Sequence, residues 1–221
     1  MSMVRIALIH ATPVAIEPVA DAFKSGWPDA FVTNLLEDSL SPDYENSGLI
    51  DEAMVERFCT LGRYVAGTGA DAIMFTCSAF GPAIEVVAKE LAPMPVLKPN
   101  EAMFEEALAA GKRIGMLATF KPSVPSMEDE FEAMADANGQ DASLESLWVE
   151  GAMDALLKGD ADTHNRLIAN AASGLTDCDI VMLAHFSTAK AKHSVMEVLD
   201  CPVLTSPESA VNKLKQTLFP V

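Results

Sequence analysis

The sequence predicts an α/β protein made of two similar lobes, each a small parallel sheet flanked by helices. Three pairs of segments carry this prediction because they repeat at nearly one spacing. They are RIALIHATP at Arg5 with RIGMLATFKP at Arg113, TGADAIMFTCS at Thr68 with TDCDIVMLAHF at Thr176, and PVLKPNEA at Pro95 with PVLTSPESA at Pro202. The spacing is identical in the first two pairs and shorter by a single position in the third. A shared spacing of this kind indicates two related halves.

Each half contains the same elements in the same order. A short apolar strand opens it, and a mixed segment, an amphipathic stretch, a second apolar strand, a helix and a final short strand follow. The expected ranges in the two halves are 4–9 and 113–118 for the first strand, 51–66 and 161–174 for the amphipathic stretch, 71–76 and 179–184 for the second strand, and 95–97 and 202–204 for the final strand. Strands that are apolar throughout and alternate with helices are typical of a parallel sheet covered on both faces. The closing stretch SPESAVNKLKQTLF predicts a capped helix.

We expect the first lobe to comprise residues 1–97 plus 206–221, and the second lobe to comprise residues 98–205. Cys77 and His185 follow the second apolar strand of each half in equivalent places. Ligands of open parallel sheets bind beyond the carboxyl ends of the strands. The repeat therefore predicts an active site in the cleft between the two lobes, with both side chains facing it.

The charge of the chain argues against several classes of partner. With 15 Lys and Arg against 32 Asp and Glu, the formal net charge is −17. A surface this acidic repels phosphate backbones and anionic membranes, so neither nucleic-acid nor membrane binding is expected. No segment reaches membrane-spanning length, and the opening MSMVRIALIHATP reads as a first strand rather than a signal peptide. The low cysteine content favours a reducing compartment, so we expect a cytoplasmic protein.

No cofactor is expected from the motifs. The four cysteines, Cys59, Cys77, Cys178 and Cys201, form no CxxC pair, and the four histidines form no HxxxH pair, so we expect no metal site. The glycine-rich motifs that bind nucleotides are also missing from the strand–helix turns. The expected partner is a small molecule. We also expect a homo-oligomer, because symmetric dimers are the commonest assemblies.

Cys77 stands where an apolar strand passes into a helix. It is followed by SAFGPA, in which Pro82 suits a first helical turn. A thiol at a helix N-terminus has its thiolate stabilised by the helix dipole and free N–H groups. We therefore expect a lowered pKa and the most reactive thiol of the four. The alternative from position alone is a buried, inert cysteine.

Five short segments together resemble a known family. They are RIALIHATP, FTCSAFGPA, RIGMLATF, MLAHFSTA and CPVLTSPESA. Their order and spacing resemble the aspartate/glutamate/hydantoin racemase superfamily, which includes arylmalonate decarboxylase and maleate isomerase. The resemblance implies two similar α/β lobes with an active site between them. It also implies proton transfer without a cofactor, in which one cysteine of each lobe flanks the substrate α-carbon.

The resemblance also assigns candidate residues. Cys77 matches the first-lobe cysteine, and Ser78 and Thr119 match residues that hold the substrate carboxylate. Thr12 is interpreted as the first-lobe counterpart of Thr119, and strand capping is the alternative for both threonines. The full set of candidate substrate-binding residues is Thr12, Ser78, Ala79, Thr119, Phe186, Ser187 and His10. His10 ends the first strand and is equally suited to a hydrogen-bonded scaffold role.

His185 departs from the family pattern, because the resemblance implies a second cysteine at this place. Cys178 and Cys201 precede their strands and so lie at the opposite end. Histidine has an unperturbed pKa of roughly 6.5 and can serve as a general acid or base. His185 could therefore form an asymmetric proton shuttle with Cys77, or a Cys–His nucleophile pair with it. It could also simply fill the turn.

The resemblance and the residues together predict a cofactor-independent racemase or isomerase. It would remove a proton next to a carboxylate or amide carbonyl of a small carboxylate or cyclic amide, with Cys77 and His185 as the catalytic pair. The first alternative is a decarboxylase or lyase that forms the same enediolate and protonates it from one side. The second is a small-molecule binding protein with reduced catalysis.

Overall fold

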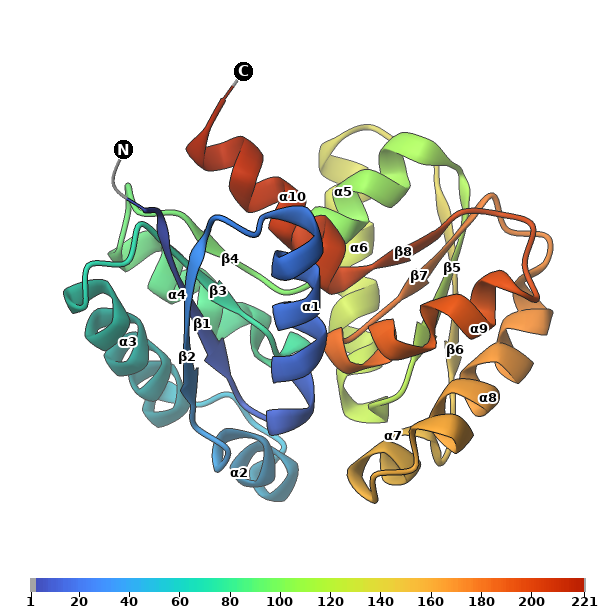
Figure 1. Ribbon diagram of the computed structural model, residues 1–221, viewed down its shortest axis with the longest axis horizontal. Helices are drawn as coiled ribbons and strands as arrows, with labels where there is room; N and C mark the ends of the chain where they lie inside the picture. Colours follow the sequence, from blue (N-terminus) through green and yellow to red (C-terminus); the bar gives the residue numbers. More distant parts are fainter. Residues whose placement is uncertain (1–2, 221) are drawn as a thin grey trace. The chain divides into compact units, whose positions relative to one another are not determined.

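The computed structural model describes residues 3–220, and the chain divides into two compact α/β units (Figure 1). The first unit consists of Met1–Pro99 and Ala210–Val221, and the second of Asn100–Ser209. Sequence analysis placed the two divisions after residues 97 and 205. The second division lies inside the last helix, α10 (Ser206–Leu218), rather than before it.

The first unit contains a four-stranded parallel sheet in the order β2-β1-β3-β4. Its strands are β1 (Arg5–His10), β2 (Phe31–Leu36), β3 (Ala72–Phe75) and β4 (Val96–Leu97). Its helices are α1 (Ile16–Gly26), α2 (Leu40–Ser47), α3 (Glu52–Gly67) and α4 (Gly81–Glu90), with the short 3₁₀ turns η1 (Pro13–Ala15) and η2 (Ser78–Phe80). Every residue of β3 is buried, as expected for a strand covered on both faces.

The second unit repeats this sheet in the order β6-β5-β7-β8, again with parallel pairs. Its strands are β5 (Arg113–Ala118), β6 (Ser143–Trp148), β7 (Ile180–Leu183) and β8 (Val203–Thr205). Its helices are α5 (Glu101–Ala110), α6 (Val124–Ala137), α7 (Ala152–Leu157), α8 (Ala161–Ala172) and α9 (Lys192–Met196), with the 3₁₀ turns η3 (Lys121–Ser123), η4 (Ser173–Leu175) and η5 (Phe186–Ala191).

The strand register repeats together with the sequence. Ile6 pairs with Ala72 in the first sheet, and Ile114 pairs with Ile180 in the second. Both partners are shifted by the spacing that separates Arg5 from Arg113, so the two sheets correspond residue by residue along these strands. The predicted pair of similar α/β lobes is confirmed.

The first and third strands of each sheet are also joined at their amino ends by an aspartate. The backbone N–H of Arg5 donates to the Asp71 carboxylate, and that of Arg113 donates to the Asp179 carboxylate. Hydrogen bonds from the backbone and side chain of Arg113, together with the backbone N–H of Lys112, lower the pKa of Asp179 to about 2. The two aspartates therefore tie the amino ends of neighbouring strands together.

Both faces of the second sheet are covered by separate apolar clusters. Ile114, Met116 and Ala118 of β5 pack with residues of α5 and α6. Leu117, between them in sequence, packs on the other face with residues of α8, α9 and η5. Alternate residues of a strand point to opposite faces, so one apolar strand supplies both clusters. This explains why the strands read as continuous apolar runs.

The edge strands β2 and β6 lie in the segments that sequence analysis could describe only as mixed. Residues of both strands alternate between half-buried and exposed. An edge strand is covered incompletely, so polar residues such as Thr33, Asn34, Ser143 and Glu145 interrupt its apolar pattern. Periodicity alone therefore did not identify β2 and β6.

A glycine in α3 permits close packing against α4. A Cβ atom added at Gly62 would lie 2.6 Å from Cγ1 of Val87. We expect Gly62→Ala to lower the free energy of unfolding by about 1–3 kcal/mol, because the methyl group overpacks the contact. Gly67→Ala is the matched control, because its Cβ atom would meet nothing within 4 Å. Urea unfolding of both variants tests this, and equal stabilities would contradict the packing argument.

Candidate functional site

The candidate site in the first unit lies where β3 ends. Cys77 has an extended backbone, with φ −115° and ψ 120°, immediately before η2 and α4. Its side chain is half-buried, whereas Ser78 and Ala79 after it are buried. The apolar strand ends here because the chain leaves the covered sheet and turns into a helix. The predicted strand-to-helix turn at Cys77 is present.

Burial raises the pKa of the Cys77 thiol, and its polar neighbours Ala79 and Ser41 only oppose that shift. The expected lowering is therefore wrong. The turn that follows is a three-residue 3₁₀ segment, and its N–H groups do not compensate for the desolvation of a thiolate. At neutral pH Cys77 rests as the protonated thiol.

His10 is a scaffold residue at the end of β1. Its Nδ1 atom lies 2.9 Å from Oγ1 of Thr76, and its Nε2 atom lies 2.9 Å from Oδ1 of Asn34. Burial lowers its pKa, so it is neutral at pH 7. The ring thereby links the carboxyl ends of three adjacent strands, close to Cys77. Of the two roles that the sequence left open, the contacts favour the scaffold role.

The corresponding turn of the second unit is centred on His185. Among residues 3–220 it is the one non-glycine residue with positive φ, at 72°, and its ψ of 138° lies outside the left-handed helical region. Such a conformation costs roughly 1–3 kcal/mol and persists only where surrounding contacts enforce it. The imidazole is buried and supplies those contacts.

The ring nitrogens of His185 are both engaged inside the second unit. The backbone N–H of Thr119 donates to Nδ1 over 3.3 Å, and Nε2 lies 2.8 Å from Oγ of Ser123. Ser123 in turn donates its proton to the carbonyl of Phe120 over 2.9 Å. Nδ1 must therefore be the acceptor and Nε2 must carry the hydrogen. Burial lowers the pKa of His185 to about 4, so this neutral tautomer is the form at neutral pH.

The remaining second-unit candidates gather around the same turn. Phe186 and Ser187 are buried in η5, and Oγ1 of Thr119 lies 3.3 Å from Oγ1 of Thr188. The structure thus brings Thr119, His185, Phe186 and Ser187 together at the carboxyl ends of β5 and β7. In the first unit it likewise groups His10, Cys77, Ser78 and Ala79 at the carboxyl ends of β1 and β3.

The register corrects one of the predicted correspondences. Ile9 pairs with Phe75 and Leu117 pairs with Leu183, so the offset of the repeat places Cys77 on His185 as predicted. The same offset places Thr119 on Ala11, not on Thr12. Thr12 corresponds to Phe120, and its half-buried side chain makes no capping hydrogen bond to η1. Its interpretation as the counterpart of Thr119 is wrong because the short matching motifs did not align the loop residues individually.

Four polar residues of these turns were missed by sequence analysis. They are Asn34, Ser41, Ser123 and Thr188. The position of Ser123 could have been predicted, because it lies in KPSVP, shortly after β5 and Thr119. Ser41 has none, because it reaches the carbonyl of Ala11, after β1, from a helix that follows a different strand.

Neither a metal centre nor a membrane segment is found in the part of the chain that the structure describes. No group of three or more His, Cys, Asp or Glu side chains between residues 3 and 220 is placed to hold a metal ion. None of the helices there is long and apolar enough to cross a membrane. An open surface hollow of about 430 Å³ contains none of the predicted site residues; it is lined by Glu37, Ala53, Glu56, Arg57, Thr60 and Leu61.

Comparison with known proteins gives a consistent set of relatives. The model of the Asp/Glu/Hydantoin racemase family matches residues 28–214. The fold is similar to that of glutamate racemase from Francisella tularensis subsp. tularensis SCHU S4 in complex with D-glutamate, with a TM-score of 0.74, 14% identity, and 99% of this chain and 82% of that chain covered. No curated protein sequence matches this chain significantly.

Two further solved structures carry the same fold. Allantoin racemase from Pseudomonas fluorescens matches with a TM-score of 0.64 and 16% identity, covering 97% of this chain and 90% of that one. A glycine-to-cysteine mutant of arylmalonate decarboxylase in the sulfate ion associated form matches with a TM-score of 0.62 and 19% identity, covering 98% and 94%. At these identities the likeness establishes the fold, and the family assignment rests on the family model.

Proposed function

Because the chain belongs to the Asp/Glu/hydantoin racemase family, and is therefore an enzyme of the racemase/isomerase type, we propose that it transfers protons without a cofactor. The proposed substrate is a small carboxylate or cyclic amide with an acidic α-C–H. Cys77 is the residue that exchanges a proton with the α-carbon. Membership of an enzyme family disfavours the alternative of a binding protein with reduced catalysis.

The observation that carries this proposal is the setting of Cys77. Its thiol lies at the carboxyl end of β3, where parallel sheets bind ligands. Its polar neighbours Ala79 and Ser41 favour the thiolate form, against the effect of burial. Hydrogen-bond donors aimed at developing negative charge are the main electrostatic contribution to catalysis of this kind. Buried Ser78 and Thr119 are proposed to bind the substrate carboxylate.

Racemisation needs a second group that acts on the opposite face of the α-carbon. His185 is the proposed group, because it occupies the place equivalent to Cys77 in the second unit. Its ring is neutral at pH 7, and its Nε2–H is committed to Ser123. To act as an acid it must redirect this hydrogen towards substrate, while the N–H of Thr119 keeps the ring in place.

One observation favours a second candidate reaction, decarboxylation. A reaction that only protonates an enediolate needs a proton donor and no second base, and Cys77 rests as a thiol. In that reaction the bond between the α-carbon and one carboxylate breaks, CO₂ is released, and the electron pair stays on the substrate as an enediolate. The α-carbon then takes the S–H proton of Cys77, and water reprotonates the thiolate.

Incubation in heavy water tests these alternatives. Glutamate, aspartate, allantoin, a 5-substituted hydantoin and an arylmalonate would each be incubated with the enzyme. Deuterium at the α-carbon with loss of optical activity supports the racemase, and CO₂ release with deuterium on one face supports the decarboxylase. Exchange that persists in full in Cys77→Ala would contradict the assignment of Cys77.

A further inference from the structure

A lysine at the carboxyl end of the second sheet lies over an indole ring. Lys121 begins η3, shortly after β5, and its Nζ atom lies 4.6 Å from the centroid of the Trp148 ring. Trp148 is the last residue of β6 and pairs in register with Ala118, the last residue of β5. The lysine and the ring therefore lie at the end of the sheet where ligands of parallel sheets bind.

The backbone that carries Lys121 is fixed by the contacts that hold His185. The N–H of Thr119 donates to Nδ1 of His185, and Oγ of Ser123 lies 2.8 Å from Nε2. The N–H and the hydroxyl group of Ser123 both donate to the carbonyl of Phe120, over 3.3 Å and 2.9 Å. The segment from Thr119 to Ser123 is thus tied to the imidazole at both ends. Lys121 lies in the middle of it, and its side chain is exposed.

The ammonium group of Lys121 keeps its full charge. No carboxylate among residues 3–220 lies within ion-pair distance of its Nζ atom, which contacts the aromatic face of Trp148 instead. The face of an indole attracts a cation but does not neutralise it. An uncompensated cation is unusual in a chain whose formal net charge is −17. It creates local positive charge beside the candidate site, where an anion can bind.

The internal repeat shows that the fold does not require this pair. Leu36 ends β2 beside β1 in the same register as Trp148 ends β6 beside β5. The offset of the repeat places Pro13 on Lys121, and each of these residues begins a three-residue 3₁₀ turn. The first unit therefore builds the same strand end and the same turn with a leucine and a proline. The lysine and the tryptophan are dispensable for the architecture.

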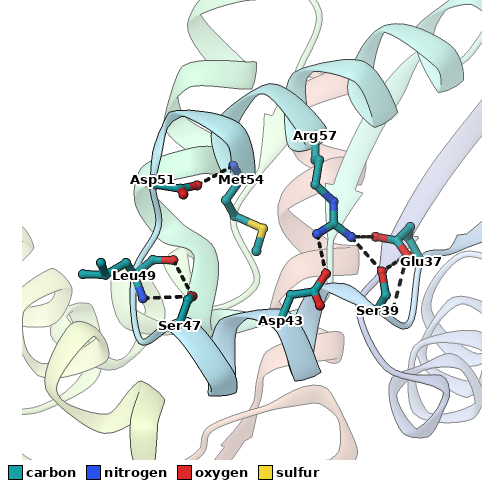
Figure 2. Close-up of polar contacts among 8 residues, drawn as sticks. All are labelled: Glu37, Ser39, Asp43, Ser47, Leu49, Asp51, Met54 and Arg57. Carbon is teal, nitrogen blue, oxygen red and sulfur yellow. Dashed lines mark hydrogen bonds and ion pairs between the residues drawn. The ribbon is translucent and has the colours of Figure 1, made fainter.

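The basic group near the end of β2 is neutralised, in contrast to Lys121. Figure 2 shows the guanidinium group of Arg57 in contact with Glu37, Ser39 and Asp43. Two carboxylates thus compensate this single positive charge. A cation at the end of an edge strand is not left open by default, since the first unit pairs its own.

We propose that Lys121, held in place by Trp148, binds a second carboxylate of the substrate, remote from the carboxylate bound at Thr119. This inference rests on the proposed function and narrows its substrate class to acids with two anionic groups, in preference to neutral cyclic amides. A single ammonium group compensates one negative charge, which suits one carboxylate.

Trp148 acts in this proposal as a positioning residue for Lys121. A lysine side chain has many rotamers, and ordering it on binding has an entropic cost. A ring that holds the stem and the ammonium group beforehand lowers that cost. The exposed carboxylates of Glu150 and Asp154 follow β6 in the chain and oppose the binding of anions, so the lysine is needed to offset them.

Isothermal titration calorimetry with matched acid and amide pairs tests the proposal. The pairs are aspartate with asparagine, glutamate with glutamine, and phenylmalonate with its monoamide, and the members of each pair differ by one charged group. The wild type should bind the acid of at least one pair about 10-fold more tightly than its amide, because a charge-assisted hydrogen bond is gained. Lys121→Met should remove this preference without weakening the amide, and Lys121→Arg should retain most of it.

Lys112→Met is the matched control for the loss of charge. Lys112 is also exposed, but it precedes β5 and so lies at the amino end of the same strand. Its variant should keep the wild-type preference for the acid. The proposal is overturned if the wild type binds every amide as tightly as its acid, if Lys121→Met keeps the preference, or if Lys112→Met loses it equally.

Trp148→Leu tests the positioning role, because it introduces the residue that the first unit has at this place. The preference for the acid should fall by a smaller factor than in Lys121→Met, and the affinity for the amide should be unchanged. An undiminished preference in Trp148→Leu would overturn the role of the ring.

This inference and the proposed function fail in different ways, because calorimetry needs no turnover. If Cys77→Ala exchanges the α-proton in full while Lys121→Met loses the preference for acids, the proposed function fails and the role of Lys121 stands. If Cys77→Ala is inactive but the Lys121→Met enzyme distinguishes acids from amides as the wild type does, the function stands and the role of Lys121 fails.

Discussion

Cys77→Ser should lower the rate of α-proton exchange by about 10²–10⁴, because the proton-transfer group is replaced by a hydroxyl of much higher pKa. The measurement is deuterium incorporation from heavy water into whichever candidate substrate the wild type turns over. The binding of that substrate should weaken far less, since Ser78 and Thr119 remain in place. This is the largest effect on activity that the structure predicts.

Cys201→Ser is the matched control for this variant. Cys201 is a half-buried free thiol like Cys77, and burial raises its pKa in the same direction. It precedes β8 and so lies at the amino end of its strand, away from the candidate site. Its variant should exchange the α-proton at the wild-type rate. Equal losses in both variants would show that thiol removal acts through folding rather than through catalysis.

The second large effect concerns stability and pH. The pKa of folded His185 is about 4, below the ordinary value near 6.5, because burial disfavours the charged ring. Between these two pH values the unfolded chain binds a proton that the folded chain does not. The free energy of unfolding should therefore fall as the pH drops from about 6.5 to about 4, and His185 alone should account for about 3 kcal/mol. Above pH 6.5 its contribution should be constant.

Urea unfolding at a series of pH values, compared between variants, isolates this contribution from that of the carboxylates. In His185→Gln the fall in stability between pH 6.5 and pH 4 should be smaller by about 3 kcal/mol. His193→Gln is the control, because the His193 side chain is 89% exposed and pairs only loosely with Glu197. If His185→Gln and His193→Gln follow the same pH curve, His185 is protonated in the folded protein and its proposed tautomer is wrong.

His10 and His164 should add to the same acid sensitivity. Burial lowers the pKa of both, so each contributes stability with the same sign, and that contribution is lost as the pH falls below their ordinary pKa near 6.5. His164 is also completely buried with no hydrogen-bond partner for Nε2. The acid sensitivity that remains in His185→Gln should therefore be reduced further by a second substitution at either position.

The sequence by itself determined the architecture and the place of the candidate site. The internal repeat and the apolar runs of β1, β3, β5 and β7 are local patterns, because strands covered on both faces must be apolar throughout. The spacing of the repeat placed Cys77 and His185 at equivalent strand ends, which the register then confirmed.

The tertiary structure decided how the residues at those ends behave. The thiol of Cys77 has a raised pKa and His185 is neutral because the surrounding elements bury them, and burial outweighs the turn geometry that the sequence displays. Ser41 reaches the Ala11 carbonyl after β1 because α2 packs on the turn at Phe80 through Tyr44. Contacts between segments distant in the chain leave no periodic signal, so residue spacing could not predict them.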